Sequence, residues 1–183
     1  MPARTRNILI IMGSVREGRR CPAIAAWVAA RRPTSLNCEV VDLKDWHLPM
    51  DDETAIPATG VYANDHTRAW SAKVAGADGF VIVTPQYNWG YPAPLKNALD
   101  HLYDEWKAKP LMLVTYGGHG GDKCAKQLRT VAKGLNMKTV WTSPALTITR
   151  AQILGAPFDA EHDLKRHVPK VKRAWRQLEN ALR

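Results

Sequence analysis

The sequence is poor in cysteine. Its 183 residues include only Cys21, Cys38 and Cys124, an odd number that is scattered along the chain and contains no CxxC pair. Disulfide-stabilised secreted domains and structural zinc sites both need more cysteines in tighter spacing. We therefore expect no disulfide framework and no metal site, and we expect the protein in the reducing cytoplasm.

Long apolar runs are also missing. No apolar stretch approaches the ~20 residues that are needed to cross a bilayer. The apolar run from Ile8 to Met12 follows two arginines, as in a secretory signal, but the run is too short and Arg16 comes soon after it. We interpret this run as a buried strand and expect no membrane partner.

Two common nucleotide-binding motifs are absent after that run. The segment GSVREGRR has no lysine where GxxxxGK[ST] requires one, and it does not match GxGxxG. Asp42, the acid at the end of the next apolar run, lies 29 residues beyond Gly13. This separation is larger than the ~20 residues of a dinucleotide fingerprint. The pattern argues against a P-loop NTPase and against an NAD pyrophosphate at this loop, and it fits a mononucleotide phosphate better.

What the sequence does contain is typical of one folded domain. Hydrophobic residues make up 45% and charged residues 23% of the chain, and the formal net charge is +9. The basic residues gather near 16–20 and 165–176. We interpret the second group as the solvated face of a terminal helix, because aromatic and basic residues do not interleave there as a nucleic-acid-binding stripe would require. We expect one domain over residues 1–183 and no nucleic-acid partner.

Apolar runs alternate with helical patterns, which indicates βα units and a parallel sheet. Strands are expected at 7–12, 38–43, 79–84, 109–115 and 139–146. Helices are expected at 22–32, 66–75, 94–106, 122–135 and 169–182. Consecutive apolar positions in several of these strands favour a sheet that is covered on both faces. The connection 44–65 has no pattern, and a loop of this length is either functional, an interface or incidental.

Ligands of open α/β sheets bind at the carboxyl ends of the strands, which directs attention to the loops after the first, third and fourth strands. In the first loop, Gly13 and Ser14 are followed by Arg16, Arg19 and Arg20, just before a helix. Free backbone N–H groups, a hydroxyl and guanidinium groups suit a phosphate. The alternative is a polar turn with exposed arginines.

The other two loops are aromatic and glycine-rich. In PQYNWGYP, residues 85–92, Gln86 and Asn88 can hydrogen-bond the edge of a heterocycle, and the aromatic rings between them can stack on it. The same aromatic residues could instead cover the core or contact another subunit. In YGGHGG, residues 116–121, four glycines let the backbone approach a flat ligand, unless they form only a flexible turn. His119 is expected to face solvent rather than to donate a proton.

With these three loops, the sequence resembles the NAD(P)H-dependent FMN reductases, which include quinone, azo-compound and chromate reductases. The resemblance rests on GSVR, TPQYNWGYPAPLKNALD and TYGGHGG, in this order and at this spacing, and it covers about residues 7–150. It implies a three-layer, flavodoxin-like, doubly wound sheet of five parallel strands in the order 2-1-3-4-5. It also implies a homodimer, with an interface role for residues 44–65 and for the helix that bears Tyr103, Asp104 and Trp106.

The resemblance implies the site residues one by one. The flavin phosphate would be held by Ser14, Arg16 and Arg19, and Arg19 or Arg20 would attract the 2′-phosphate of NADPH, which is therefore favoured over NADH. The residues expected to line the flavin ring are Pro85, Gln86, Tyr87, Asn88, Trp89, Tyr116, Gly117 and Gly118. Family members often carry a small hydroxyl residue in place of Arg19 and Glu in place of Gln86.

The implied reaction is a hydride transfer from NAD(P)H to bound FMN and on to a quinone, a free flavin, an azo compound or a metal oxyanion. No side chain is expected to act as a general acid, base or nucleophile, because the cofactor supplies the chemistry. The alternative is a flavodoxin-like electron carrier without its own substrate site. Such carriers are typically strongly acidic, whereas this chain is basic.

Overall fold

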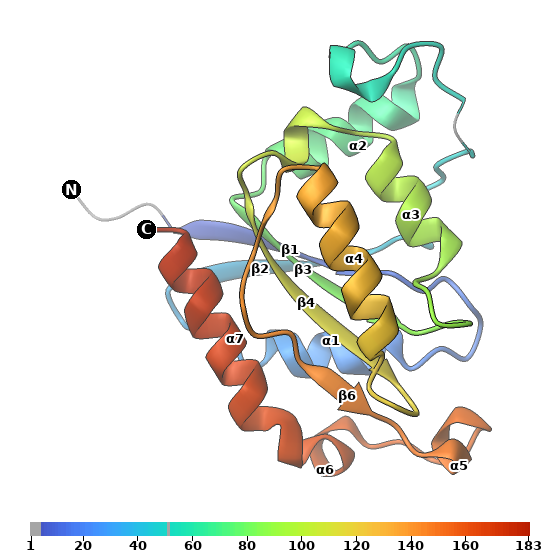
Figure 1. Ribbon diagram of the computed structural model, residues 1–183, viewed down its shortest axis with the longest axis vertical. Helices are drawn as coiled ribbons and strands as arrows, with labels where there is room; N and C mark the ends of the chain where they lie inside the picture. Colours follow the sequence, from blue (N-terminus) through green and yellow to red (C-terminus); the bar gives the residue numbers. More distant parts are fainter. Residues whose placement is uncertain (1–4, 51) are drawn as a thin grey trace.

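The computed structural model describes residues 5–50 and 52–183, and strands alternate with helices along them (Figure 1). The elements are, in order, β1 (Arg6–Met12), α1 (Cys21–Ala29), β2 (Leu36–Asp42), η1 (Pro57–Thr59), α2 (Asp65–Ala75), β3 (Gly79–Pro85), α3 (Ala93–Asp100), η2 (Asp104–Trp106), β4 (Pro110–Gly117), α4 (Asp122–Gly134), β5 (Lys138–Thr139), β6 (Ala145–Thr147), α5 (Arg150–Ile153), α6 (Ala160–Asp163), η3 (Lys165–His167) and α7 (Val168–Ala181). None of the described helices combines the length and the apolar character that crossing a bilayer requires.

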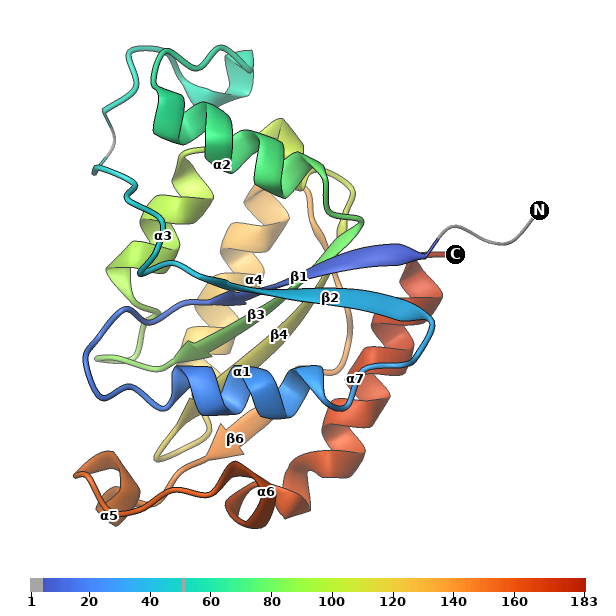
Figure 2. The same ribbon diagram turned by 180° about the vertical axis from the view of Figure 1, so that it is seen from behind.

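The strands form one parallel sheet in the order β2-β1-β3-β4-β5, which confirms the expected order. Central strand β1 pairs with β2 on one side, where Ile10 lies opposite Val40, and with β3 on the other, where Ile10 lies opposite Val81. Helices α1 and α7 lie on one face of the sheet and α2, α3 and α4 on the other (Figures 1 and 2). The fold is therefore the three-layer flavodoxin-like arrangement.

Side chains of β1 alternate between two cores, one on each face of the sheet. Ile8, Ile10 and Met12 pack into the core beneath α1 and α7. Leu9 and Ile11 pack into the core beneath α2, α3 and α4. All five are buried, so the consecutive apolar run in the sequence has the cause that was expected for it.

Tryptophans fill both cores and also satisfy carbonyl groups. Trp175 on α7 is fully buried, and its indole N–H donates to the Val28 carbonyl of α1 at 3.0 Å. In the other core, the ring of Trp106 packs edge-on against Phe80, at 4.9 Å between centroids, and against Trp70 at 6.2 Å. Trp175, Trp106 and Trp70 thus bury a large apolar area and still donate their indole N–H groups, whereas the Nε1 of the buried Trp27 finds no partner among the described residues.

The prediction of one continuous fifth strand at 139–146 is wrong. The segment is split into β5 and β6, which pair with successive parts of β4. Between them, Arg129 of α4 donates to the carbonyls of Val140 and Trp141, at 3.2 and 2.8 Å. The Thr142 N–H donates to the Gln177 side chain at 2.8 Å. Side chains of α4 and α7 thus hydrogen-bond the backbone between β5 and β6, and the chain leaves the sheet between these two strands.

The predicted helix 94–106 is too long. Helix α3 ends at Asp100, and the chain then makes the separate turn η2. The break lets Trp106 enter the core, where its indole N–H donates to the Leu99 carbonyl at 3.1 Å. The other predicted helices end within three residues of the expected positions, and Pro22, Pro94 and Pro169 lie in first turns, where a missing N–H costs no helical bond.

Replacing Trp175 tests the packing of α7. Trp175→Ala should lower the free energy of unfolding by about 3–5 kcal/mol, because it opens a cavity and removes the indole donor from the Val28 carbonyl, which keeps the Arg31 N–H as a partner. Trp141→Ala is the matched control, since that side chain is 88% exposed, and it should change the free energy by at most about 0.5 kcal/mol. Urea unfolding measures both. Equal losses at the two positions would contradict the burial of Trp175 described here.

Candidate functional site

The three singled-out loops lie together at one edge of the sheet. Strand order reverses between β1 and β3, because β2 lies outside β1 and β4 lies outside β3. The carboxyl ends of β1, β3 and β4 are therefore neighbours, and the loops that follow them lie together where open α/β sheets have their binding crevice. A hollow of about 760 Å³ lies elsewhere, between Thr5, Leu36 and Leu182, and none of the three loops lines it. The loop edge carries the chemistry, so we take it as the candidate site.

The first and second loops are joined by predicted site residues. The Gly13 N–H donates to the Val83 carbonyl at 2.9 Å, so the chain stays close to β3 as it leaves β1. A Cβ at Gly13 would lie 2.7 Å from the Thr84 hydroxyl oxygen, which only glycine avoids. Ser14 is fully buried, and its hydroxyl lies 2.9 Å from the Tyr87 hydroxyl. Ser14 therefore fixes where the tyrosine ring lies.

The three arginines of the first loop have different partners. The guanidinium of Arg16 lies over the Tyr87 ring, 4.4 Å from its centroid, while Arg16 itself is exposed. Arg19 forms an ion pair with Asp42, and both side chains are largely buried. Arg20 turns away and donates to the Gln152 and Ala156 carbonyls, at 3.2 and 2.6 Å. Two of the arginines thus border the crevice, and Arg20 attaches a later segment to the loop.

A two-residue hairpin forms the tip of the second loop. Tyr87 and Gly90 exchange two backbone hydrogen bonds of 2.9 and 2.8 Å. Between them, Asn88 and Trp89 both have positive φ, 46° and 70°, as a type I′ turn requires. Asparagine tolerates this region, but for a bulky residue such as Trp89 it is strained. Trp89 is 66% exposed, and the Lys123 ammonium lies 4.1 Å from the centre of its ring.

Gln86 joins the second loop to the third. Its side-chain oxygen accepts from the N–H groups of Lys123 and Cys124, both at 3.1 Å, in the first turn of α4. Its own backbone N–H donates to the Tyr116 carbonyl at 2.9 Å. Pro85, the last residue of β3, lies opposite Tyr116 in the sheet. The carbonyl of the Gln86 amide, which was expected to meet a ligand, thus caps a helix and leaves the NH₂ group for other partners.

The third loop needs its glycines. Gly120 and Gly121 have φ of 74° and 79°. A Cβ on Gly121 would lie 2.8 Å from the Thr115 Cβ, and one on Gly120 would lie 2.9 Å from the Ala145 Cβ. Gly118, in contrast, is exposed, and its nearest neighbour is Ile153. The last two glycines fix the turn, and the first two, Gly117 and Gly118, lie beside Gln86 and Ile153 without side chains of their own. His119 is exposed, as expected.

Two buried polar atoms lie beside the crevice. The Tyr116 hydroxyl and the Arg19 Nε find no hydrogen bond within residues 5–50 and 52–183. Burial raises the pKa of Tyr116, and Cys21, Tyr87 and Arg19 are the groups around its hydroxyl. The Cys21 thiol interacts with the Tyr116 hydroxyl, so the Arg19 Nε of the first loop is the donor that suits a polar ligand, because buried groups of this kind are normally satisfied.

The thiols in this region are not nucleophiles. Cys21 is fully buried and donates to the Val83 carbonyl at 3.3 Å, and burial raises its pKa. Burial also raises the pKa of Cys38 to about 11 and that of Cys124 to about 12. Thiolates, the reactive form, are therefore scarce at neutral pH. All three cysteines are free.

Residues 149–158 also border the site, and the sequence analysis did not single them out. Thr149 and Gln152 form a capping box that starts the short helix α5. The helix places Ile153, which is 56% exposed, next to the glycine loop. Arg20 donates to carbonyl groups at and just after the end of this helix. The sequence TRAQ, residues 149–152, has the pattern of a capping box and could have indicated that a helix starts here.

The fold and this edge together define a class, the flavodoxin-like domains with a binding crevice where strand order reverses. Residues 6–150 match the NADPH-dependent FMN reductase family, and the chain belongs to it. An NAD(P)H-dependent FMN reductase of Schizosaccharomyces pombe is 54% identical over 93% of this chain and 88% of its own length. A quinone reductase of Escherichia coli is 31% identical over 68% of each chain. The structure of FerB, a flavoenzyme NAD(P)H:(acceptor) oxidoreductase of Paracoccus denitrificans, is similar with a TM-score of 0.74 at 16% identity, covering 96% of this chain and 98% of that one.

A side chain at the left-handed glycine turn should destabilise the third loop. We expect Gly121→Ala to lower the free energy of unfolding by at least about 1–2 kcal/mol, because it adds a left-handed non-glycine residue and a clash with Thr115. The control is Gly134→Ala, at the exposed end of α4, where a Cβ meets nothing within 4 Å and helix propensity favours alanine by up to about 1 kcal/mol. Urea unfolding should therefore give effects of opposite sign, and the same sign for both variants would be evidence against this turn.

Proposed function

We propose that the chain is an FMN-dependent oxidoreductase that uses NAD(P)H to reduce a small acceptor, with quinones as the first acceptors to test. The observation that carries the proposal is the meeting of three loops at one edge of the sheet. A phosphate-type loop, an aromatic hairpin and a glycine-rich loop lie together there, joined by the Ser14–Tyr87 and Gln86–Lys123 hydrogen bonds, and membership of the reductase family supports the same proposal. We also propose that residues 1–183 form a single FMN-binding domain.

The first loop would bind the phosphate. Arg16 is exposed beside Tyr87 and can turn toward an anion, and the Arg19 Nε has no partner among the described residues. The Ser14 hydroxyl is already oriented by Tyr87. An anion there would receive charge-assisted hydrogen bonds without a large change of the backbone. Arg20 would act indirectly, by holding residues 152–156 against this loop.

The second and third loops would bind the ring. Tyr87 and the exposed Trp89 offer rings that can stack, and Asn88 and the NH₂ group of Gln86 offer polar groups for a heterocycle edge. Backbone at Gly117 and Gly118 would approach the ring closely, because no side chain intervenes. When bound, the flavin supplies the redox chemistry, since it accepts a hydride from NAD(P)H and delivers two electrons and protons to the acceptor. These residues position the reactants and exclude water, and none is proposed as a general acid or base.

Four finer assignments belong to the same proposal. Met50, Ile56 and Val61 are exposed apolar residues of the connection 44–64, and we propose that this connection contributes to a homodimer interface. Three free thiols suit a reducing compartment, which supports the cytoplasm. The net charge of +9 and the arginines of the first loop favour NADPH, with its additional phosphate, over NADH. Azo compounds, free flavins and metal oxyanions are further candidate acceptors.

The purified protein should be yellow, or should turn yellow with added FMN, and should oxidise NADPH steadily in the presence of benzoquinone. The flavin released on denaturation should be FMN and not FAD. Absorption spectra and NADPH consumption at 340 nm measure both results. A colourless protein that takes up no FMN would refute the proposal, and a flavin that is reduced only once, without turnover, would favour an electron carrier.

Removing one guanidinium should separate phosphate binding from ring binding. We expect Arg16→Ala to weaken FMN binding by about 10- to 100-fold, the loss of a hydrogen bond to a charged group. Binding of riboflavin, which lacks the phosphate, should stay nearly unchanged. Arg173→Ala, which removes an exposed charge from α7, is the control and should alter neither affinity. Fluorescence titration measures all four combinations, and equal losses for FMN and riboflavin would argue against a phosphate contact.

A further inference from the structure

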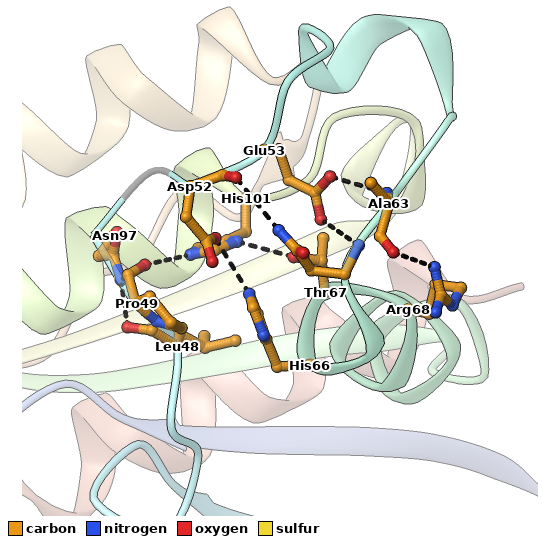
Figure 3. Close-up of polar contacts among 11 residues, drawn as sticks. Leu48, Pro49, Asp52, Glu53, Ala63, His66, Thr67, Arg68, Asn97 and His101 are labelled. Carbon is orange, nitrogen blue, oxygen red and sulfur yellow. Dashed lines mark hydrogen bonds and ion pairs between the residues drawn. The ribbon is translucent and has the colours of Figure 1, made fainter.

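A second cluster of chemically active side chains lies outside the three loops. The long connection after β2 passes over the start of α2 and the end of α3, and Asp52, His66 and His101 meet there (Figure 3). One ligating atom from each lies within 4.8 Å of the other two. Two imidazoles and one carboxylate are metal ligands, and the proposed flavin site uses none of the three.

His101 is held in the orientation of a metal ligand. It is buried, with 4% of its surface exposed, and its Nε2 lies 2.8 Å from the Pro49 carbonyl. A carbonyl only accepts, so Nε2 carries the proton and Nδ1 keeps a lone pair, 3.2 Å from the Thr67 hydroxyl. Metal-binding histidines characteristically donate their other N–H to a backbone carbonyl or a carboxylate, which fixes the tautomer and the ring.

His66 and Asp52 are the two candidate ligands on the solvent-exposed side of the cluster. His66, in the first turn of α2, has its Nε2 3.0 Å from an Asp52 carboxylate oxygen. The rings of His66 and His101 are nearly perpendicular, with centroids 5.9 Å apart. The side chains of His66 and Asp52 are 27% and 36% exposed. Both can therefore rotate, and water can reach a fourth coordination position.

The charges around the cluster favour a cation. Next to Asp52, Glu53 accepts from the backbone N–H groups of Ala63 and Asn64, at 2.8 and 3.1 Å. The Glu53 carboxylate also offers the Thr67 hydroxyl an acceptor other than His101.

We propose that Asp52, His66 and His101 form a binding site for one divalent transition-metal ion, for which Zn²⁺ is the best match. Zn²⁺ accepts imidazole nitrogen and carboxylate oxygen at about 2.0–2.2 Å, and three protein ligands plus water give its open tetrahedral form. Ligating atoms must then come to about 3.4 Å from one another, which rotation of the two exposed side chains provides. The Thr67 hydroxyl turns to Glu53, and His66 binds through Nε2 as the neutral tautomer that carries its proton on Nδ1; an imidazolium would release its second proton to solvent.

The ion would attach the connection 44–64 to the helices beneath it. Without it, the attachment consists of hydrogen bonds, such as those from Asn97 to the Leu48 and Pro49 carbonyls at 3.0 and 3.2 Å. A ligand that binds only the folded chain stabilises it by mass action. The structural alternative is that the three side chains only hold the connection by hydrogen bonds, and it predicts no metal binding.

Zn²⁺ titrated into the chelator-treated full chain tests the proposal, with calorimetry for affinity and thermal unfolding for stability. We expect one ion per chain and a higher Tm. His66→Gln and Asp52→Asn should each weaken binding by more than about 100-fold, since loss of an outer-shell partner already costs 10- to 100-fold. His47→Gln removes an exposed histidine of the same connection and should leave binding unchanged.

The variants at His66 and Asp52 keep the buried His101, so we expect them to fold. Circular dichroism checks this. Two results would overturn the proposal. One is failure of the wild-type chain to bind Zn²⁺ at millimolar concentration. The other is binding with the same affinity in His66→Gln and Asp52→Asn, which would assign the ion to other residues. Neither measurement depends on whether the chain binds FMN.

Discussion

The burial of β1 between two parallel neighbours is the constraint on which the rest of the structure depends. Because both faces of the strand are covered, every side chain from Ile8 to Met12 must be apolar, and the strand cannot lie at an edge. The chain must then place β2 on one side and β3 on the other, which reverses the strand order at β1. The loops that begin at Gly13 and Gln86 emerge side by side for this reason, and the Ser14–Tyr87 hydrogen bond follows from it.

The parts of the fold that the sequence predicted are those with a local cause. Apolar runs gave four strands nearly to their ends, and glycines and prolines marked the loops. The division of the fifth strand has a distant cause, since Arg129 and Gln177 take over the hydrogen bonds of residues 140–142. The early end of α3 is similar, because Trp106 gains more from the core around Phe80 than from a continued helix.

Local and distant causes also separate what could and could not be predicted about the two sites. The loops that border the crevice carry short motifs, so the sequence could single them out, but it could not give the partners of their residues. Gln86 caps α4 and Arg20 holds residues 152–156, and nothing in the sequence near either residue indicates these bonds. The cluster of Asp52, His66 and His101 has no motif spacing at all, because three different elements supply it. Counting cysteines addresses only sites built from thiolates, so it could not have indicated this one.

The loop edge of the sheet and the connection 44–64 differ in how their backbones are held in place. This difference decides where a bound ion would add most to stability. At the crevice, strained residues such as Trp89 persist because the sheet and two hairpin hydrogen bonds determine the turn. Among the described residues of the connection 44–64, at 44–50 and 52–64, the regular structure is the short 3₁₀ turn η1, and the segment depends on single side chains such as Glu53, Asn97 and His101. A segment with so few backbone bonds opens at low free-energy cost. A metal ion shared by three elements would therefore stabilise the chain more at this connection than at the sheet edge, which is already rigid.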